Sequence, residues 1–167
     1  MNTQTIALKR NDHKRNYLLH FLFLIALLFT FFSGNVFAGK EVNIDKDTGL
    51  AIYGYDPVAY FTQSKPVKGK AEFVTEYQGN KWAFSSAEHK ELFTANPDKY
   101  LPEYGGYCAY AASIDRVVDI DPDAWTIHND KLYLNFNDNV RSRWLKDVDD
   151  RIVTGDKNWP ALLEGLK

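Results

Sequence analysis

Cys108 is the only cysteine of the 167-residue chain, and it lies in the segment YGGYCAYAA. A cysteine can serve as a small buried hydrophobe, as a soft metal ligand or as a nucleophile. The small residues around Cys108 favour tight packing. As a ligand it could bind Cu(I), zinc or the edge of a haem with help from His89, and as a nucleophile it would need a base within reach. The sequence leaves these three roles open.

His89 and the tyrosines are the other residues that could do chemistry. A neutral imidazole is a common metal ligand, although a half-buried histidine packed on an aromatic ring is the alternative. Tyrosines gather in the segments 53–60 and 100–110, where they could fill a core or line a pocket for a small or planar ligand. The candidate ligand-binding residues are Tyr60, Ser85, His89, Tyr104, Tyr107 and Cys108. Cys108 and His89 are also the candidate metal ligands.

The N-terminus has the pattern of a cleavable secretory signal. Four basic residues precede an apolar stretch over 17–32 that lacks Asp, Glu, Lys and Arg. Val36 and Ala38 then place small residues at the usual positions before a cleavage site, so we expect cleavage after Ala38. The apolar stretch is shorter than the roughly 20 residues that span a bilayer. The pattern therefore predicts residues 1–38 as a signal peptide and a periplasmic or secreted location.

The remaining chain has the size of one domain. The full sequence has 20 basic and 22 acidic residues, and removal of residues 1–38 leaves 16 and 21, a formal charge of −5. This balance does not favour nucleic acid or an anionic membrane surface as a partner. A single cysteine cannot form an internal disulfide, so stability has to come from packing, for which the aromatic residues are suited. No internal repeat is evident after residue 39. We therefore expect a small ligand, a metal or an exported protein as the partner.

Two hairpin signals, each followed by a helix signal, indicate the fold class. The first hairpin is expected around Gln78-Gly79-Asn80, and a helix capped at Ser85 should follow it to residue 95, with Leu92 and Phe93 buried. The second hairpin is expected around Asn129-Asp130, followed by a helix that starts at Asn137 or Asn139 and ends with Gly155 as its C-cap. The pattern predicts a small α+β domain, with a polar lead-in over 39–53 and the domain itself over 54–167.

Several of these motifs resemble the YHS domain family, small modules found in exported proteins and attached to metal-handling proteins. The resemblance covers roughly residues 54–107, and the segments YGGYCAYA and KLYLNF extend it to an exported single-domain subfamily. Metal-associated members carry Asp-Pro-Val-Cys-Gly-Met and Phe-Cys-Ser-x-x-Cys motifs, the second opening a helix that ends in Pro-x-Lys-Tyr. The positions of these motifs other than the cysteines are matched here by Asp56, Pro57, Val58, Phe84, Ser86, Phe93, Pro97, Lys99 and Tyr100.

The cysteines of those family motifs are replaced in this chain. Ala59, Ser85 and His89 stand at the three positions, so the family's metal site is not carried over. We expect an exported YHS-domain protein that binds something rather than turning it over. Its ligand could be a metal ion, with copper and zinc as candidates, or a metal-bearing cofactor, held near Cys108 and His89. The alternatives are a protein-interaction module in which Cys108 is structural, and a thiol-dependent enzyme.

Overall fold

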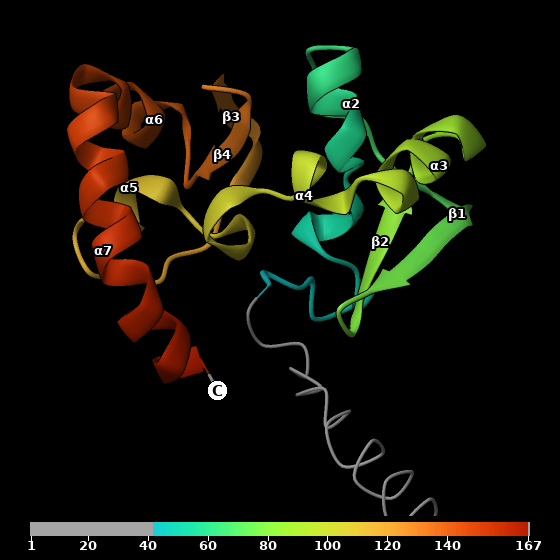
Figure 1. The fold of residues 1–167 in the computed structure, drawn as a ribbon, viewed down its shortest axis with the longest axis horizontal. Coiled ribbons are helices and arrows are strands. Elements are labelled where there is room, and N and C mark those ends of the chain that lie inside the picture. The colour runs from blue at the N-terminus through green and yellow to red at the C-terminus, as the bar shows by residue number, and fades with distance from the viewer. Residues whose placement is uncertain (1–41, 167) are drawn as a thin grey trace, which may run out of the picture. The chain divides into compact units, whose positions relative to one another are not determined.

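The computed structural model describes residues 42–166, which belong to one compact unit over 36–167; the predicted signal peptide lies outside the described residues. This part is a small α+β domain with two antiparallel hairpins, each followed by helices, as the sequence predicted (Figure 1). Within residues 42–166, no helix combines the length and the apolar character needed to cross a membrane.

The first half of the domain is built around the hairpin of β1 (Lys70–Tyr77) and β2 (Asn80–Phe84), drawn in green in Figure 1. Helix α2 (Pro57–Thr62) precedes it, and helices α3 (Ala87–Ala95) and α4 (Pro97–Tyr100) follow. The cap of α3 is Ser86, one residue later than expected, because its hydroxyl accepts the hydrogen bond from the backbone N–H three residues on. Phe93 is fully buried as expected, but Leu92 is 36% exposed, so its predicted burial was wrong.

The second half is built around the hairpin of β3 (Asp121–His128) and β4 (Lys131–Asn135), drawn in orange in Figure 1. Helix α5 (Ala109–Ser113) precedes it, and helices α6 (Asp138–Trp144) and α7 (Val148–Leu166) follow, joined by a short 3₁₀ turn. Asn129 and Asp130 both have positive φ, which suits the two-residue hairpin turn that the sequence indicated. Asn137 is the cap of α6.

The two halves repeat one backbone plan. Each has a left-handed turn, a short helix, a hairpin and a second helix, in that order. The hairpins share the same register irregularity, between Lys70 and Val74 in the first and between Asp121 and Trp125 in the second. Each half also pairs its start with the second strand of its hairpin through an isolated parallel bridge. The domain is therefore a tandem of two structurally equivalent copies.

The equivalence extends to the helices that follow the hairpins. Ser86 and Asn137 cap α3 and α6 in the same way, each accepting from the third residue along the helix. Seven residues after these caps come Phe93 and Trp144, and both are fully buried. The buried aromatic residue of each helix thus occupies the same position relative to the cap in both copies.

This repeat was not found in the sequence because the backbone is repeated while the side chains differ. Between the equivalent strands, Thr75 and Thr126 are the only identical pair. The left-handed turns differ too, and the residues with positive φ are Ile52, Tyr53 and Gly54 in the first copy and Tyr104, Gly105 and Gly106 in the second. The sequence after residue 39 shows no evident repeat, because the likeness of the two halves lies in the backbone.

The lead-in segment is hydrogen-bonded to both left-handed turns. The backbone N–H of Asn43 donates to the carbonyl of Gly105 at 2.8 Å, and the carbonyl of Asn43 accepts from the N–H of Ile52 at 2.8 Å. The turns also pack closely, since a Cβ added at Gly106 would lie 2.5 Å from Cγ2 of Ile52. Glycine is required there both by this contact and by its φ of +78°.

Helix α7 packs on the second copy and continues past the expected end. Gly155, predicted as a C-cap, lies inside α7 and is buried. The reason is packing: a Cβ at this position would lie 2.7 Å from the Tyr104 hydroxyl oxygen. Trp144 is fully buried, and Val148 and Ile152 pack against its cluster.

Candidate functional site

Asp56 is the centre of a buried polar cluster in the first copy. Its side chain is fully buried, and its Oδ1 caps α2 by accepting from the backbone N–H of Val58 at 2.9 Å and of Ala59 at 3.3 Å. Its Oδ2 accepts from the backbone N–H and the hydroxyl of Ser85, at 2.8 and 2.6 Å, and lies 2.6 Å from Nδ1 of His89. One carboxylate therefore joins α2, the end of β2 and the first turn of α3.

The second ring nitrogen of His89 is also engaged. Nε2 lies 3.1 Å from the hydroxyl oxygen of Thr62, which in turn lies 3.0 Å from the carbonyl of Val58. Ser85 donates its hydroxyl proton to Asp56, and its Oγ also lies 3.3 Å from Nδ1 of His89. The cluster contains Ser, His and Asp side chains, but it differs from a nucleophilic triad, in which the Asp and the Ser contact opposite ring nitrogens of the His. Here Asp56 and Ser85 both lie at Nδ1 of His89, and Nε2 faces Thr62.

The three positions at which the resemblance implies cysteines meet around Asp56. Ala59 offers no donor atom, Ser85 is bonded to the carboxylate, and His89 has partners at both nitrogens. A closed metal site needs about four free donors in tetrahedral reach. These residues do not fit a metal ion, and over residues 42–166 no group of three or more His, Cys, Asp or Glu side chains is placed to hold one.

Cys108 is separate from this cluster. It is 1% exposed, its Sγ accepts from the backbone N–H of Phe136 at 3.3 Å, and it donates to Oδ1 of Asn135 at 3.7 Å. Burial raises the pKa of the thiol, outweighing the backbone hydrogen bonds to the sulfur. Neither partner is shared with His89, so the structure does not bring the two candidate metal ligands together.

The repeat gives Cys108 a structural role. Cys108 precedes α5 as Asp56 precedes α2, and both receive a backbone hydrogen bond from the residue that follows the second strand, Phe136 in one copy and Ser85 in the other. Cys108 is thus the counterpart of Asp56. Asp56 was not among the candidate residues, although an Asp before Pro at a helix start is a capping signal.

The candidate tyrosines lie in different surroundings. Tyr60 packs edge-on against Trp125 and donates to the carbonyl of Pro122, and burial raises its pKa. Tyr104 and Tyr107 both contact Trp159 of α7. Burial likewise raises the pKa of both, and Tyr104 also donates to Asp156. The tyrosines therefore do not converge on Cys108 or His89.

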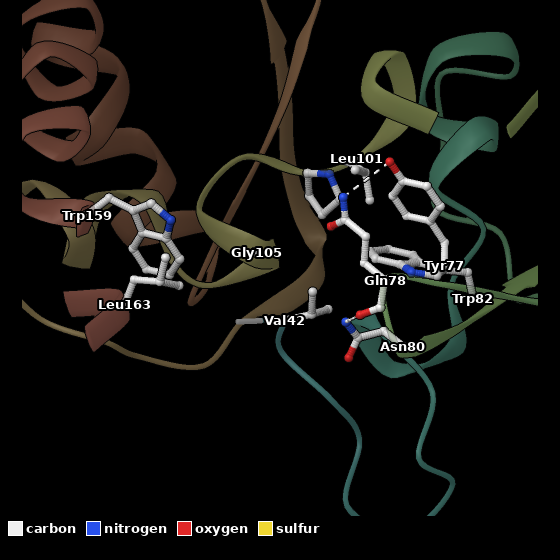
Figure 2. Close-up of a pocket in the computed structure, with 10 residues that line it drawn as sticks. Val42, Tyr77, Gln78, Asn80, Trp82, Leu101, Gly105, Trp159 and Leu163 are labelled. Atoms are coloured by element: carbon white, nitrogen blue, oxygen red, sulfur yellow. Dashed lines mark hydrogen bonds between the residues drawn. The ribbon is translucent and has the colours of Figure 1, made fainter. Parts of the chain in front are cut away.

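A cavity of about 180 Å³ lies where the two copies and α7 meet, and we call it the junction cavity (Figure 2). One wall comes from the tip of the first hairpin, another from the segment that opens the second copy, and a third from α7. The lining residues are Val42, Tyr77, Gln78, Asn80, Trp82, Leu101, Pro102, Gly105, Trp159 and Leu163. None of them was among the candidate site residues, because the cavity is formed by segments far apart in the sequence.

The junction cavity has polar groups with unused hydrogen-bonding capacity. Trp82 is 1% exposed, and its Nε1–H has no hydrogen-bond partner in the described part of the chain. Gln78 uses its Nε2 to donate to the hydroxyl of Tyr77, and Figure 2 shows its amide oxygen on the side that faces Gly105. Asn80 uses its Nδ2 to donate to the carbonyl of Gln78. The amide groups of Gln78 and Asn80 thus border the cavity, whereas the Nε1–H of Trp82 is buried away from it.

Residues 58–104 match the family model of the YHS domain, so this part of the chain is a YHS domain. The match runs from α2 to the left-handed turn of the second copy, and so covers most of the first copy and none of the second hairpin. No curated protein and no solved structure matches the chain.

Proposed function

We propose that this YHS-domain protein is an exported binding protein that holds a small organic ligand in the junction cavity. The observation that carries the proposal is the cavity itself, which is lined by apolar and aromatic side chains from segments far apart in the sequence and bordered by the amide groups of Gln78 and Asn80. Binding sites of this kind are largely apolar, with a few placed polar groups.

The contacts of Cys108 and His89 favour this proposal over a copper, zinc or metal-bearing cofactor site at those two residues. The thiol is buried and its pKa is raised by that burial, whereas a metal ligand or nucleophile has to be a thiolate. The same property disfavours a thiol-dependent enzyme. The exposed large apolar residues, Leu92, Ile114, Phe136, Leu145 and Val153, belong to five different segments, which gives little support to a protein-interaction module.

The test is to identify what the protein carries after export. Native mass spectrometry of protein purified from its export compartment should show an added small mass that is lost on denaturation. A Trp159→Ala variant, which removes one cavity wall, should lose that mass. Val153→Ala removes an apolar side chain from the same helix, 70% exposed and outside the cavity, and should keep it. A stoichiometric metal in place of an organic mass, or a mass unaffected by Trp159→Ala, would refute the proposal.

Export is the second part of the proposal and has its own measurement. The sequence pattern of residues 1–38 supports a cleavable signal, which lies outside the described residues. The intact mass of the purified protein should correspond to a chain that starts at Gly39. A chain that retains residues 1–38 would contradict cleavage while leaving the binding proposal open to its own test.

A further inference from the structure

We propose that the outer edge of β1 and the groove between β1 and α3 bind an extended peptide segment of a partner protein as an added β-strand. Three features of the molecule support this site: free main-chain groups on β1, an apolar groove beside them, and an arginine that closes the equivalent place in the second copy but is replaced in the first. The groove shares no lining residue with the junction cavity. It is therefore a second site, independent of the proposed function.

The outer edge of β1 offers main-chain hydrogen-bonding groups to a further strand. Within residues 42–166, β1 pairs with β2 and with no other segment (Figure 1). The turn between the two strands is residues 78–79, both with positive φ, so Tyr77 and Asn80 form the hydrogen-bonded pair that flanks a two-residue turn. Such pairs alternate along an antiparallel ladder, and the N–H and C=O groups of Glu76 and Val74 therefore point away from β2.

A largely apolar groove of about 490 Å³ lies beside this edge, between β1 and α3. Tyr77 contacts Phe93 of α3 edge-on, so alternate side chains of β1 face this helix. The groove contains no residue of β2 and therefore lies on the outer side of the hairpin. One cation and one anion are among its lining residues, and their charges balance. The lining residues are Phe73, Ala87, Lys90, Glu91, Thr94 and Ala95.

The second copy closes the equivalent place with its own side chains. Arg141 of α6 corresponds to Lys90 of α3, and its Nε donates to the hydroxyl of Thr126 in β3 at 2.9 Å. Ala124, which is 1% exposed, corresponds to Phe73. Over residues 42–166, Lys90 makes no hydrogen bond to β1. The side chain that ties the helix to the outer strand in the second copy is thus exchanged in the first for one that leaves the groove open.

An added strand is the occupant that fits both the edge and the groove. In strand addition the main-chain hydrogen bonds give the affinity, and pockets for alternate side chains give the specificity. This kind of binding needs no large exposed apolar patch. We expect an extended segment of about five residues that alternates polar and apolar side chains, with the apolar ones over the groove. The balanced charge of the groove favours uncharged side chains there.

The experiment is an NMR titration of the mature protein with blocked heptapeptides that alternate threonine with valine, leucine or phenylalanine. At least one of these peptides should bind with a Kd below about 1 mM. The amide signals of Val74 and Glu76 should shift, and their N–H groups should exchange more slowly with solvent, because they gain a hydrogen-bond partner. The amide of Tyr77, already paired with Asn80, should keep its exchange rate.

Two changes at one position separate the main-chain bond from side-chain contacts. Glu76→Pro removes the outward N–H without removing a bond to β2, and it should weaken the peptide at least about fivefold. Glu76→Ala keeps the N–H and should stay within about twofold of the wild type. A peptide N-methylated at alternate residues loses its own donors and should also bind more weakly, which tests the bond without altering the protein.

Four results would overturn the inference. They are no binding of any of the peptides, shifts confined to the junction cavity, equal weakening by the two changes at Glu76, and unchanged binding of the N-methylated peptide. Protection of Val74 and Glu76 without peptide that grows with protein concentration would overturn it as well, because the added strand would then come from a second copy of the chain. The proposed function has its own test at Trp159 and would stand or fall separately.

Discussion

Replacing Asp56 tests whether its carboxylate holds the first copy together. In Asp56→Ala the backbone N–H groups at the start of α2 lose their cap, which costs about 1 kcal/mol. The N–H and hydroxyl of Ser85 and the imidazole of His89 lose a shared acceptor at the same time. Removing one partner of a buried pair costs about 3–5 kcal/mol, and these contributions are not independent. We expect the free energy of unfolding to fall by about 4 kcal/mol.

The assay is urea unfolding of the mature protein followed by tryptophan fluorescence. A domain of this size has about 5–15 kcal/mol of stability, so the variant should unfold at a much lower urea concentration, and its Tm should fall by roughly 10–20 °C. Asp56→Ser retains a capping oxygen and should recover about 1 kcal/mol. Asp138→Ala is the control, since this aspartate is exposed and contacts Arg141 only at 3.5 Å, and it should cost less than about 1 kcal/mol.

The result that would refute this reasoning is a loss below about 1 kcal/mol in Asp56→Ala, indistinguishable from the control. Such a result would mean that Ser85 and His89 find other partners at little cost. A double-mutant cycle between Asp56→Ala and Ser85→Ala then measures how much of the effect belongs to that pair.

Three further measurements probe other parts of the fold. Gly155→Ala should lower the free energy of unfolding by about 1–2 kcal/mol, because the clash of the added Cβ with the Tyr104 ring outweighs the better helix propensity of alanine. Gly165→Ala is the control: it has open space around it and should be neutral or stabilising in the same urea assay. Cys108 should react with iodoacetamide at least about 10³-fold more slowly in the folded protein than in urea, because the thiol is buried and that burial raises its pKa. Mass spectrometry measures the labelling rate. Fast labelling of the folded protein would contradict the buried position. Burial and the hydrogen bond to Asp119 raise the pKa of Tyr53 from 10.0 to about 12, so the folded state keeps this proton longer than the unfolded chain does. The stability that Tyr53 contributes should be present below pH 10 and be lost between about pH 10 and 12. Tyr53→Phe should therefore lose less stability than the wild type across that pH interval. Equal losses in the two proteins would argue against the raised pKa.

The elements could be predicted from sequence because their signals are local. Gln78-Gly79 and Asn129-Asp130 mark two hairpin turns, and Ser86 and Asn137 are capping residues within one turn of the helices they start. Those predictions needed only neighbours in the chain. Errors arose at Gly155, where a glycine that suggested a helix end is instead required by a tyrosine about fifty residues earlier in the sequence.

The site could be predicted only in part, since its contacts are between distant segments. Ser85 and His89 were identified through the family motif, and they do lie together, but Asp56 joins them from about thirty residues away. The junction cavity depends on Trp82 and Trp159 reaching the same space from opposite ends of the domain. Side-chain periodicity carries no information on such pairs.

The two copies share a buried cluster, in addition to a second cluster around Trp144, and the shared cluster determines how the domain unfolds. Trp82 and Phe84 of the first hairpin belong to the same buried cluster as Leu132 and Leu134 of the second, together with Cys108. Neither half can open without exposing the apolar surface of the other. Calorimetry should therefore show a single cooperative transition whose van't Hoff and calorimetric enthalpies agree. Although its halves follow one backbone plan, the domain should behave as one folding unit, and a chain cut between α4 and the second copy should leave two pieces unable to fold separately.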